Sequence, residues 1–571
     1  MVRQVILSSM IYAVYCAGAR AEDPTWIARG RAGMVASDSP EASRIGADVL
    51  RAGGNAFDAA VATSFALSVS RPQSTGLGGG GFMVAYIAAE KRFVALDFRE
   101  TAPAGATAER YARLFAERGD GPSPSVYGGN AVGTPGQLAG LTEIRRRYGT
   151  RELRDLLAPA IRLAEDGFAV DRHYRDAVRK TVREFEKWPD LSTRHAAIYE
   201  TLLGNGKAPS IGQMVRRPAL ARSLREIAEK GPAAIYGGRI GQALARAAQE
   251  AGGTLTIEDL RGYRVREREP VRTTFAGHAI ISMPLPSSGG LCLAEILNIV
   301  EAAALRSDLH PEESRTHVLI EAMKHAFADR ARTLGDPDFA DISIAPFLDK
   351  SYAAELARRI DRARPAPSRT YGRAAAPDDR GTSHFCVVDR LGNVVALTET
   401  INGTFGSLVV AEPFGIILNN QMDDFLTARG QANLYGLVQS DANLVGPGKR
   451  PLSSMSPTIV MKDGRPVLVL GASGGPRIIT SVLQVLLNVI QREMPLDEAI
   501  AALRVHHQWM PDEVFFDRAP PSETADRLRA LGHAIARQRR TGIVQAIRML
   551  ADGTLVGAGD PRKGGRPAGV P

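Results

Sequence analysis

Asp378-Asp379-Arg380-Gly381-Thr382-Ser383-His384-Phe385-Cys386-Val387-Val388-Asp389 is the stretch of sequence at which two kinds of chain meet. Before it, residues 361–381 are rich in Arg, Ala and Pro and have no apolar period, which predicts a mobile linker. After it, apolar residues alternate with others, as expected for a buried strand. Thr382 therefore stands at the first position of a strand, directly behind a glycine.

A hydroxyl residue in this position favours a chain that cuts itself before Thr382. The freed α-amine would then act as the base for the hydroxyl of the same residue. An α-amino group titrates near ~7.7–8.0, and burial lowers that value, so it is a better base at neutral pH than an ordinary lysine. A threonine that merely begins a strand would show the same local pattern. The rest of the sequence has to decide between a self-cleaving threonine and an ordinary strand start.

Several glycine-rich and polar segments accompany this junction. A turn and a second alternating stretch, 394–401, predict a β-hairpin. Each of the remaining segments, taken alone, is weak evidence for a function, whereas many such motifs in a fixed order along the chain are strong evidence. They include Gly53-Gly54-Asn55-Ala56-Phe57-Asp58, Thr75-Gly76-Leu77-Gly78-Gly79-Gly80-Gly81-Phe82, Asp97-Phe98-Arg99-Glu100, Asn402-Gly403-Thr404, Asn420-Gln421-Met422-Asp423-Asp424, Arg450-Pro451-Leu452-Ser453-Ser454 and Ser473-Gly474-Gly475-Pro476.

On these motifs the chain resembles a γ-glutamyltranspeptidase (γ-glutamyltransferase), of the N-terminal nucleophile hydrolases, over nearly its whole length. The resemblance implies an α+β fold, a four-layer αββα sandwich with two stacked, mainly antiparallel sheets between helix layers. It implies a precursor that splits into a large subunit, 22–381, and a small subunit, 382–571, which stay together as a heterodimer. It also implies transfer of the γ-glutamyl group of glutathione and related compounds to amino acids, peptides or water, without a cofactor.

The same resemblance assigns a pocket for the γ-glutamyl group. Arg99 would hold the α-carboxylate, since its planar fork donates two parallel hydrogen bonds. Asp424 would hold the α-ammonium. Tyr435 falls in a polar, glycine-containing insert, 428–448, that is long for a structureless loop and is expected to form a lid. Four further residues would bind or orient the donor: Ser453, Ser454, Asn402 and Gln421.

Catalytic roles follow for three residues besides Thr382. Gly474 and Gly475 precede an apolar helical stretch, 478–490, and backbone N–H groups at a helix N-terminus suit a developing oxyanion. Without the resemblance, a plain glycine-rich turn would fit equally well. Thr400 would hydrogen-bond the nucleophile. Its neighbour Glu399 departs from the usual residue, but strand alternation points it to the opposite face.

Composition is that of an ordinary globular enzyme. The 571 residues are 44% apolar and 23% charged, with a net charge of +9. The arginines are spread along amphipathic helices and are not interleaved with aromatic residues, so we expect no nucleic-acid partner; the basic surface would modestly attract anionic substrates. Cys292 and Cys386 are expected to be buried thiols. His506-His507 near Asp512-Glu513 matches no common zinc spacing, so no metal is expected.

Residues 1–21 read as a secretory signal peptide, with Arg3, an apolar run over 5–17 and a small-residue cleavage site before Glu22. The run is short for a membrane span, and an uncleaved anchor is the alternative. No other stretch is apolar enough to span a bilayer, so a periplasmic protein is expected.

Two other functions share parts of this pattern. An acylase acting on glutaryl-cephalosporins or poly-γ-glutamate would keep the nucleophile and change the ammonium pocket. Asp424 argues against the glutaryl case, because that substrate has no amine to neutralise. A secreted binding protein that has lost activity is the second alternative, and it predicts no self-cleavage.

Overall fold

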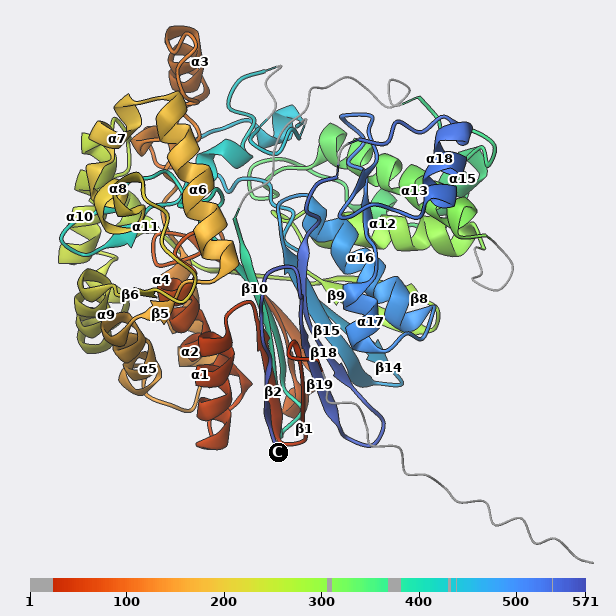
Figure 1. Cartoon of the computed structure of the whole chain (residues 1–571), viewed down its shortest axis with the longest axis horizontal. Coiled ribbons are helices and arrows are strands. Elements are labelled where there is room, and N and C mark those ends of the chain that lie inside the picture. The colour runs from red at the N-terminus through yellow and green to blue at the C-terminus, as the bar shows by residue number, and fades with distance from the viewer. Residues whose placement is uncertain (1–23, 305–310, 368–380, 430–432, 438, 537) are drawn as a thin grey trace, which may run out of the picture.

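The computed structural model describes residues 24–571 apart from 305–310, 368–380, 430–432, 438 and 537. Two seven-stranded antiparallel sheets lie face to face between layers of helices (Figure 1). Sheet I has the order β20 (Ala568–Val570), β2 (Gly33–Ser37), β10 (Ser383–Asp389), β11 (Val394–Thr400), β3 (Gly80–Ile87), β4 (Arg92–Phe98) and β7 (Arg266–Arg268). Sheet II has the order β1 (Ile27–Gly30), β19 (Leu555–Gly559), β18 (Ile543–Met549), β15 (Arg465–Ser473), β14 (Thr458–Lys462), β9 (His278–Ser282) and β8 (Val271–Phe275).

Helices cover the outer face of each sheet, which confirms the four-layer αββα sandwich. The layer on sheet I contains α1 (Pro40–Arg51), α2 (Ala56–Ser70), α4 (Gln137–Tyr148), α5 (Leu153–Asp166), α6 (Arg172–Lys187), α9 (Pro218–Lys230) and α10 (Arg239–Glu250). The layer on sheet II contains α12 (Gly289–Ala302), α13 (Glu312–Thr333), α15 (Lys350–Arg359), α16 (Arg477–Ile490) and α17 (Leu496–Ala501).

Shorter elements complete the molecule at its edges. The helices among them are α3 (Ala108–Glu117), α7 (Asp190–Arg194), α8 (Ala196–Thr201), α11 (Ile257–Gly262), α14 (Ala345–Leu348) and α18 (Ser522–Leu531). Three two-stranded pairs are β5 (Phe168–Ala169) with β6 (Met214–Val215), β12 (Val410–Ala411) with β13 (Ile416–Ile417), and β16 (Val505–His506) with β17 (Phe515–Phe516). Among the described residues, no helix is both long and apolar enough to cross a membrane.

The predicted hairpin after Thr382 is confirmed as β10 and β11. Alternate side chains of β10 pack in two different hydrophobic cores. Phe385 and Val387 lie in the core between sheet I and its helices, whereas Cys386 and Val388 lie in the core between the two sheets. Both faces are buried, so every side chain of the strand is fixed by packing. Cys292 and Cys386 are free and buried, as expected.

The register of this hairpin places the two threonines at one end of sheet I. Ser383 lies opposite Glu399, so the residues next to them, Thr382 and Thr400, are neighbours at the open end of the pair. The predicted helix over 478–490 is confirmed as α16. The proposed leader, 1–21, and most of the linker, 368–380, lie outside the described residues, so the cleavage positions stay predictions.

Glu399 points into the helix layer, away from Thr400, as strand alternation predicts. Its carboxylate accepts hydrogen bonds from Ser64 of α2 and Gln137 of α4 and is fully buried. Burial raises the pKa of Glu399 to about 8 despite these donors.

We expect Glu399→Gln to become progressively more stabilising, relative to the unchanged protein, as the pH rises from 4.5 to 8. The unfolded carboxyl ionises near its ordinary pKa of 4.5, while the folded one keeps its proton until about 8. Over that interval the folded state binds more protons, so stability is lost with rising pH, by up to ~1.4 kcal/mol per unit. Melting temperatures at several pH values measure this, with exposed Glu229→Gln of α9 as control. A pH-independent difference for Glu399→Gln would contradict it.

Candidate active site

Thr382 lies at the start of β10 with its side chain buried and its hydroxyl against a second hydroxyl. The two Oγ1 atoms of Thr382 and Thr400 are 3.1 Å apart. Thr400 Oγ1 accepts a hydrogen bond from the Asn402 backbone N–H at 2.7 Å, so its own proton is directed towards Thr382 or the Gly381 carbonyl, 3.4 Å away. The Thr382 hydroxyl also contacts that carbonyl. The Thr382 hydroxyl and the peptide bond before it are therefore held together.

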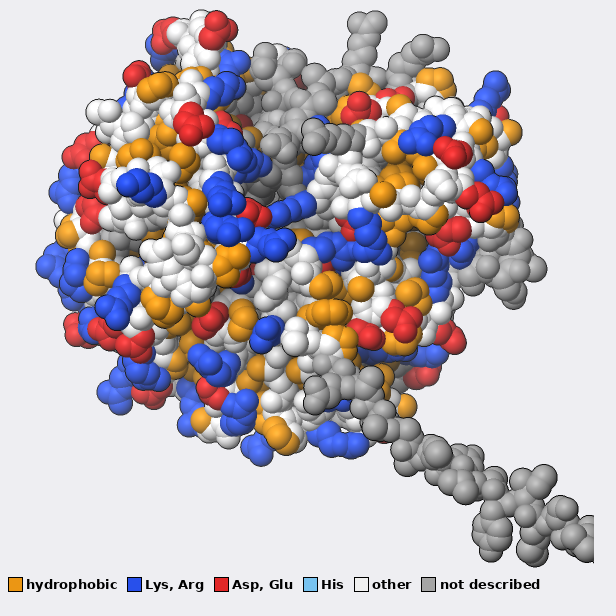
Figure 2. All heavy atoms as spheres, viewed as in Figure 1, with side chains coloured by type: hydrophobic (Ala, Val, Ile, Leu, Met, Phe, Trp, Pro, Cys, Tyr) orange, Lys and Arg blue, Asp and Glu red, His pale blue; other side chains and the backbone are white. Residues whose placement is uncertain are grey.

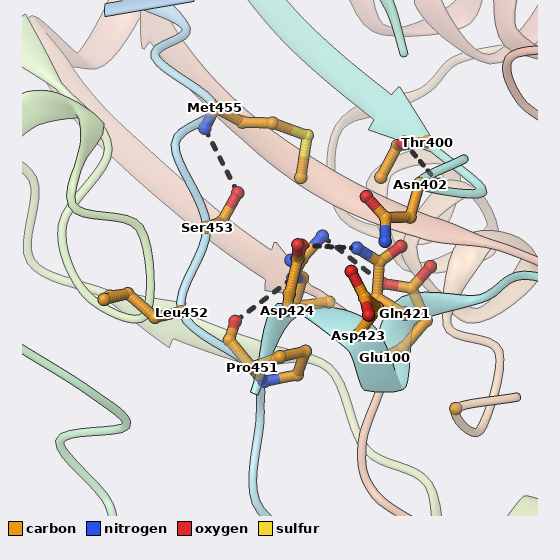
Figure 3. Close-up of polar contacts among 12 residues, drawn as sticks. Glu100, Thr400, Asn402, Gln421, Asp423, Asp424, Pro451, Leu452, Ser453 and Met455 are labelled. Atoms are coloured by element: carbon orange, nitrogen blue, oxygen red, sulfur yellow. Dashed lines mark hydrogen bonds and ion pairs between the residues drawn. The ribbon is translucent and has the colours of Figure 1, made fainter. Parts of the chain in front are cut away.

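A buried ion pair, Arg99 with Asp424, lines the same small pocket as Thr382, and Figure 3 shows Asp424 beside Gln421. Arg99 contacts the Asp424 carboxylate through Nη2 and donates through Nε to the Pro451 carbonyl at 3.3 Å. Gln421 Nε2 donates to the same carboxylate at 2.8 Å. Burial raises the pKa of Asp424, against the opposing effect of Arg99. Arg99 directly follows β4, Gln421 and Asp424 lie in the turn Gln421–Asp424, and Pro451 lies in the loop before β14, so the fold assembles this cluster from three distant segments.

The predicted donor-binding residues meet in one small pocket. Arg99, Asp424 and Gln421 line it together with Asn402, Ser453, Ser454 and Tyr435, and Thr382 forms part of its wall. Ser453 Oγ accepts the Met455 N–H at 3.1 Å, which leaves its hydroxyl proton for another acceptor. The structure thus brings together every residue that the sequence assigned to the γ-glutamyl group.

Tyr435 is part of the wall of this pocket. Its hydroxyl donates to Asn402 Oδ1 at 2.6 Å, and its ring is so close to Gly475 that a Cβ there would approach it to 2.5 Å. The pocket beneath has a volume of about 20 Å³, room for roughly one water molecule. The position of Tyr435 fits the expected lid, although residues 430–432 and 438 of that insert lie outside the described chain.

Gly474 and Gly475 join β15 to α16, as the sequence predicts. Their φ angles are +129° and +58°, conformations that residues with a side chain rarely adopt. Both residues lie directly before the N-terminus of α16, where backbone N–H groups and the helix dipole favour negative charge. Gly475 lines the small pocket, while Gly474 lines a larger cleft that Thr382 also lines.

Sequence reasoning missed a buried pair that holds the backbone of Thr382. Lys563 Nζ donates to the Thr382 carbonyl at 3.0 Å and pairs with Asp38, whose carboxylate also accepts the Ser383 hydroxyl at 3.1 Å. Burial lowers the pKa of Lys563. Asp38 and Lys563 lie at opposite ends of the chain, without a motif to connect them; the position of Ser383 beside the nucleophile was the one available signal.

Glu100 was also missed, although it follows Arg99 in a quoted motif. It is fully buried, its carboxylate lies 3.8 Å from the Arg99 guanidinium, and burial raises its pKa to about 8. When Glu100 is protonated, Asp424 is the one charged carboxylate paired with Arg99 among the described residues.

The histidines that could suggest a metal have other partners. His506 bonds to Thr480 and Gln508, and His507 accepts the Trp509 N–H. Elsewhere in the described chain, ligand atoms of three buried residues lie within 4.8 Å of one another: His317, Glu321 and His533. The ammonium of Lys324 donates to Glu321 at 2.8 Å, and His317 Nδ1 and His533 Nε2 are hydrogen-bonded at 2.7 Å, so hydrogen bonds account for this cluster.

Comparison with known proteins decides the family. The family model described as Gamma-glutamyltranspeptidase matches residues 42–570. The chain belongs to the γ-glutamyltranspeptidase family. It is 42% identical over 545 residues to the glutathione hydrolase proenzyme of Escherichia coli (strain K12), covering 95% of this chain and 92% of that protein.

Acylases are also among the relatives of this γ-glutamyltranspeptidase family member. The Acylase ACY 1 proenzyme of Pseudomonas sp. (strain SE83) is 38% identical over 549 residues, covering 95% of this chain and 94% of that protein. Among solved structures, the cephalosporin acylase from Bacillus halodurans matches with a TM-score of 0.84 at 27% identity, covering 99% of this chain and 100% of that one. The fold is thus shared by both activities, and the pocket has to distinguish them.

We expect Lys563→Met to destabilise this protein by about 3–5 kcal/mol, because it leaves the Asp38 carboxylate buried beside Arg71 alone, 3.9 Å away. Urea unfolding measures this, in a Thr382→Ala background so that one unbroken chain unfolds. The double variant Lys563→Met/Asp38→Asn should recover much of the loss, since no buried charge is left without its partner. A loss below about 1 kcal/mol, or no recovery, would show that the pair is not coupled.

Proposed function

We propose that this protein is an autoprocessed γ-glutamyl transferase and hydrolase that cleaves the γ-glutamyl amide of glutathione and related compounds. The observation that carries the proposal is the position of Thr382 between a scissile backbone carbonyl and a buried Arg99–Asp424 pair. The contact between the Thr382 hydroxyl and the backbone carbonyl suits self-cleavage. The Arg99–Asp424 pair suits binding of an amino acid with a free carboxylate and a free ammonium.

Maturation would use the geometry at Gly381. Thr382 Oγ1 attacks the Gly381 carbonyl carbon, the peptide C–N bond breaks, and the acyl group passes from nitrogen to oxygen as an ester. Water then hydrolyses that ester and frees both the Gly381 carboxylate and the Thr382 amine and hydroxyl. Thr400 assists by donating its proton towards the carbonyl oxygen, which gains negative charge in this step.

Catalysis would reuse the same hydroxyl. Arg99, Ser453 and Ser454 hold the donor's α-carboxylate and Asp424 its α-ammonium, while Asn402 and Gln421 orient it. Thr382 Oγ1 attacks the γ-carbonyl carbon, and the free α-amine of Thr382 takes the hydroxyl proton.

The backbone N–H groups of Gly474 and Gly475 would stabilise the oxyanion. The leaving amine departs with the proton held by the α-amine, and a γ-glutamyl ester remains. Water, an amino acid or a peptide then takes the acyl group.

Binding of a donor requires Tyr435 to move. A pocket of about 20 Å³ cannot hold a γ-glutamyl group, and Tyr435, whose ring lies against Gly475, is one of the residues that enclose it. Loops that cover a site in this way commonly open and close on each turnover. We propose that the Tyr435 segment is the lid of the donor pocket.

The two subunits, 22–381 and 382–571, would remain associated after cleavage. In sheet I, the small-subunit strands β10 and β11 lie between β2 and β3 of the large subunit, with backbone pairing on both sides. Export through the leader at 1–21 to the periplasm belongs to the same proposal and rests on the sequence pattern.

Thr382→Ala is expected to remain a single chain on a denaturing gel and to release no p-nitroaniline from γ-glutamyl-p-nitroanilide, because it lacks the attacking oxygen. Thr382→Ser, which keeps a hydroxyl, is the matched control and should still be cut. If a Thr382→Ala chain were cleaved and active, another nucleophile would have to be sought.

Comparing a substrate that has an α-amine with one that lacks it tests the acylase alternative. We expect the protein to cleave γ-glutamyl-p-nitroanilide in preference to glutaryl-p-nitroanilide, and Asp424→Asn to lower that ratio of kcat/KM by about 10–100-fold, as removal of a charged hydrogen bond would. The ratio is measured within each variant, so a general loss of stability does not affect it. A wild-type protein that prefers the glutaryl substrate would be an acylase instead.

A further inference from the structure

A large basic cleft, distinct from the small pocket beside Arg99, is also lined by Thr382. It has a volume of about 530 Å³, within the ~300–1,000 Å³ range of ligand pockets. Thr382 lines both spaces, so a substrate whose γ-glutamyl end lies beside Arg99 extends its other end into this cleft. The amine that leaves, and an acceptor that replaces it, would occupy the same space.

The lining of the cleft is strongly cationic. Eight Lys and Arg residues line it, with Asp176 the one acidic residue among the described residues of its wall. Figure 2 shows Lys and Arg side chains gathered in a band across the middle of this face, beside α6. The eight are Arg179, Lys180, Arg183, Arg477, Arg539, Arg540, Arg562 and Lys563.

Some of these charges are already neutralised and others are not. Arg540 pairs with Asp176 at 3.0 Å, Arg562 with Asp517 and Asp560, and Lys563 with Asp38. In the described part of the chain, neither Arg179 nor Arg183 has an ion-pair partner. Both are exposed and stand one helical turn apart on α6, so their guanidinium groups lie on one face towards the cleft.

Positive charge in the cleft also acts on its buried wall. His173, at the start of α6, has its pKa lowered well below the ordinary value, first by burial and then by the charges of Lys563, Arg71 and Arg540. A cleft of one sign with low-dielectric walls concentrates ligands of the opposite sign. Carboxylates are natural partners of arginine because its planar fork binds them through two hydrogen bonds.

We propose that this cleft selects γ-glutamyl substrates whose leaving or accepting amine is an acidic peptide carrying two or more carboxylates. The inference rests on the proposed function and adds the substrate class for its second half. One carboxylate, as in the Cys-Gly part of glutathione, would use only part of the cationic surface. Arg179 and Arg183 are the residues that would bind the additional carboxylates.

Two donors of equal size test the proposal: γ-glutamyl-glutamyl-glutamate and γ-glutamyl-glutaminyl-glutamine amide. We expect kcat/KM to be about tenfold higher for the acidic donor at 50 mM NaCl, and this ratio to fall severalfold at 500 mM, since salt screens exposed charges. Arg179→Gln/Arg183→Gln should lower the ratio about five- to tenfold. Arg162→Gln/Arg172→Gln, which removes two exposed arginines that do not line the cleft, is the control and should change it less than twofold.

A ratio near one in the wild-type protein, or an equal fall in both double variants, would overturn the proposal. Cleavage of γ-glutamyl-p-nitroanilide distinguishes this failure from failure of the proposed function. A protein that cleaves it but does not favour the acidic donor is a γ-glutamyl enzyme without this selectivity. A protein that cleaves none of the three contradicts both.

Discussion

The structure depends on the burial of β10 on both of its faces. One set of alternate side chains packs against the helices and the other against sheet II, so the strand cannot shift by one residue without reversing both sets. That constraint fixes the position of Thr382 at the end of the strand. The neighbouring strand β11 then fixes Thr400 opposite it, and the Asn402 N–H orients the Thr400 hydroxyl. Packing thus positions Thr382, the proposed nucleophile, and the polar contacts add to that constraint.

Two different environments meet at Thr382. One is a small pocket that contains a buried ion pair, and the other is a wide cleft with an excess of positive charge. Gly475 lines the pocket and Gly474 the cleft, directly before α16. A substrate whose amide bond lies at Thr382 would therefore have its two parts recognised by different chemistry. The ion pair would bind one part and the cationic cleft the other, although both parts carry carboxylates.

The layers of the fold and the set of residues that line the small pocket were expected from the family resemblance, which rests on several ordered motifs in the sequence. The alternation in 383–389 is a property of the strand itself, and Arg99 and Asp424 stand in recognisable segments. The Lys563–Asp38 pair could not be predicted, since its members are separated by most of the chain and neither stands in a motif. The cationic cleft could not be predicted for the same reason. In the sequence Arg179 and Arg539 resemble ordinary surface arginines, and only the fold brings them into one cleft with Thr382.

The interleaving of strands has a consequence for the lifetime of the protein. Once the chain is cut before Thr382, folding would become a reaction of two molecules, because β10 and β11 would have to find their places between β2 and β3 of a separate chain. Loss of structure would then be followed by separation, and dilution would oppose reassembly. The durability of the mature enzyme would be set by how slowly it opens, and its melting temperature would depend on the heating rate.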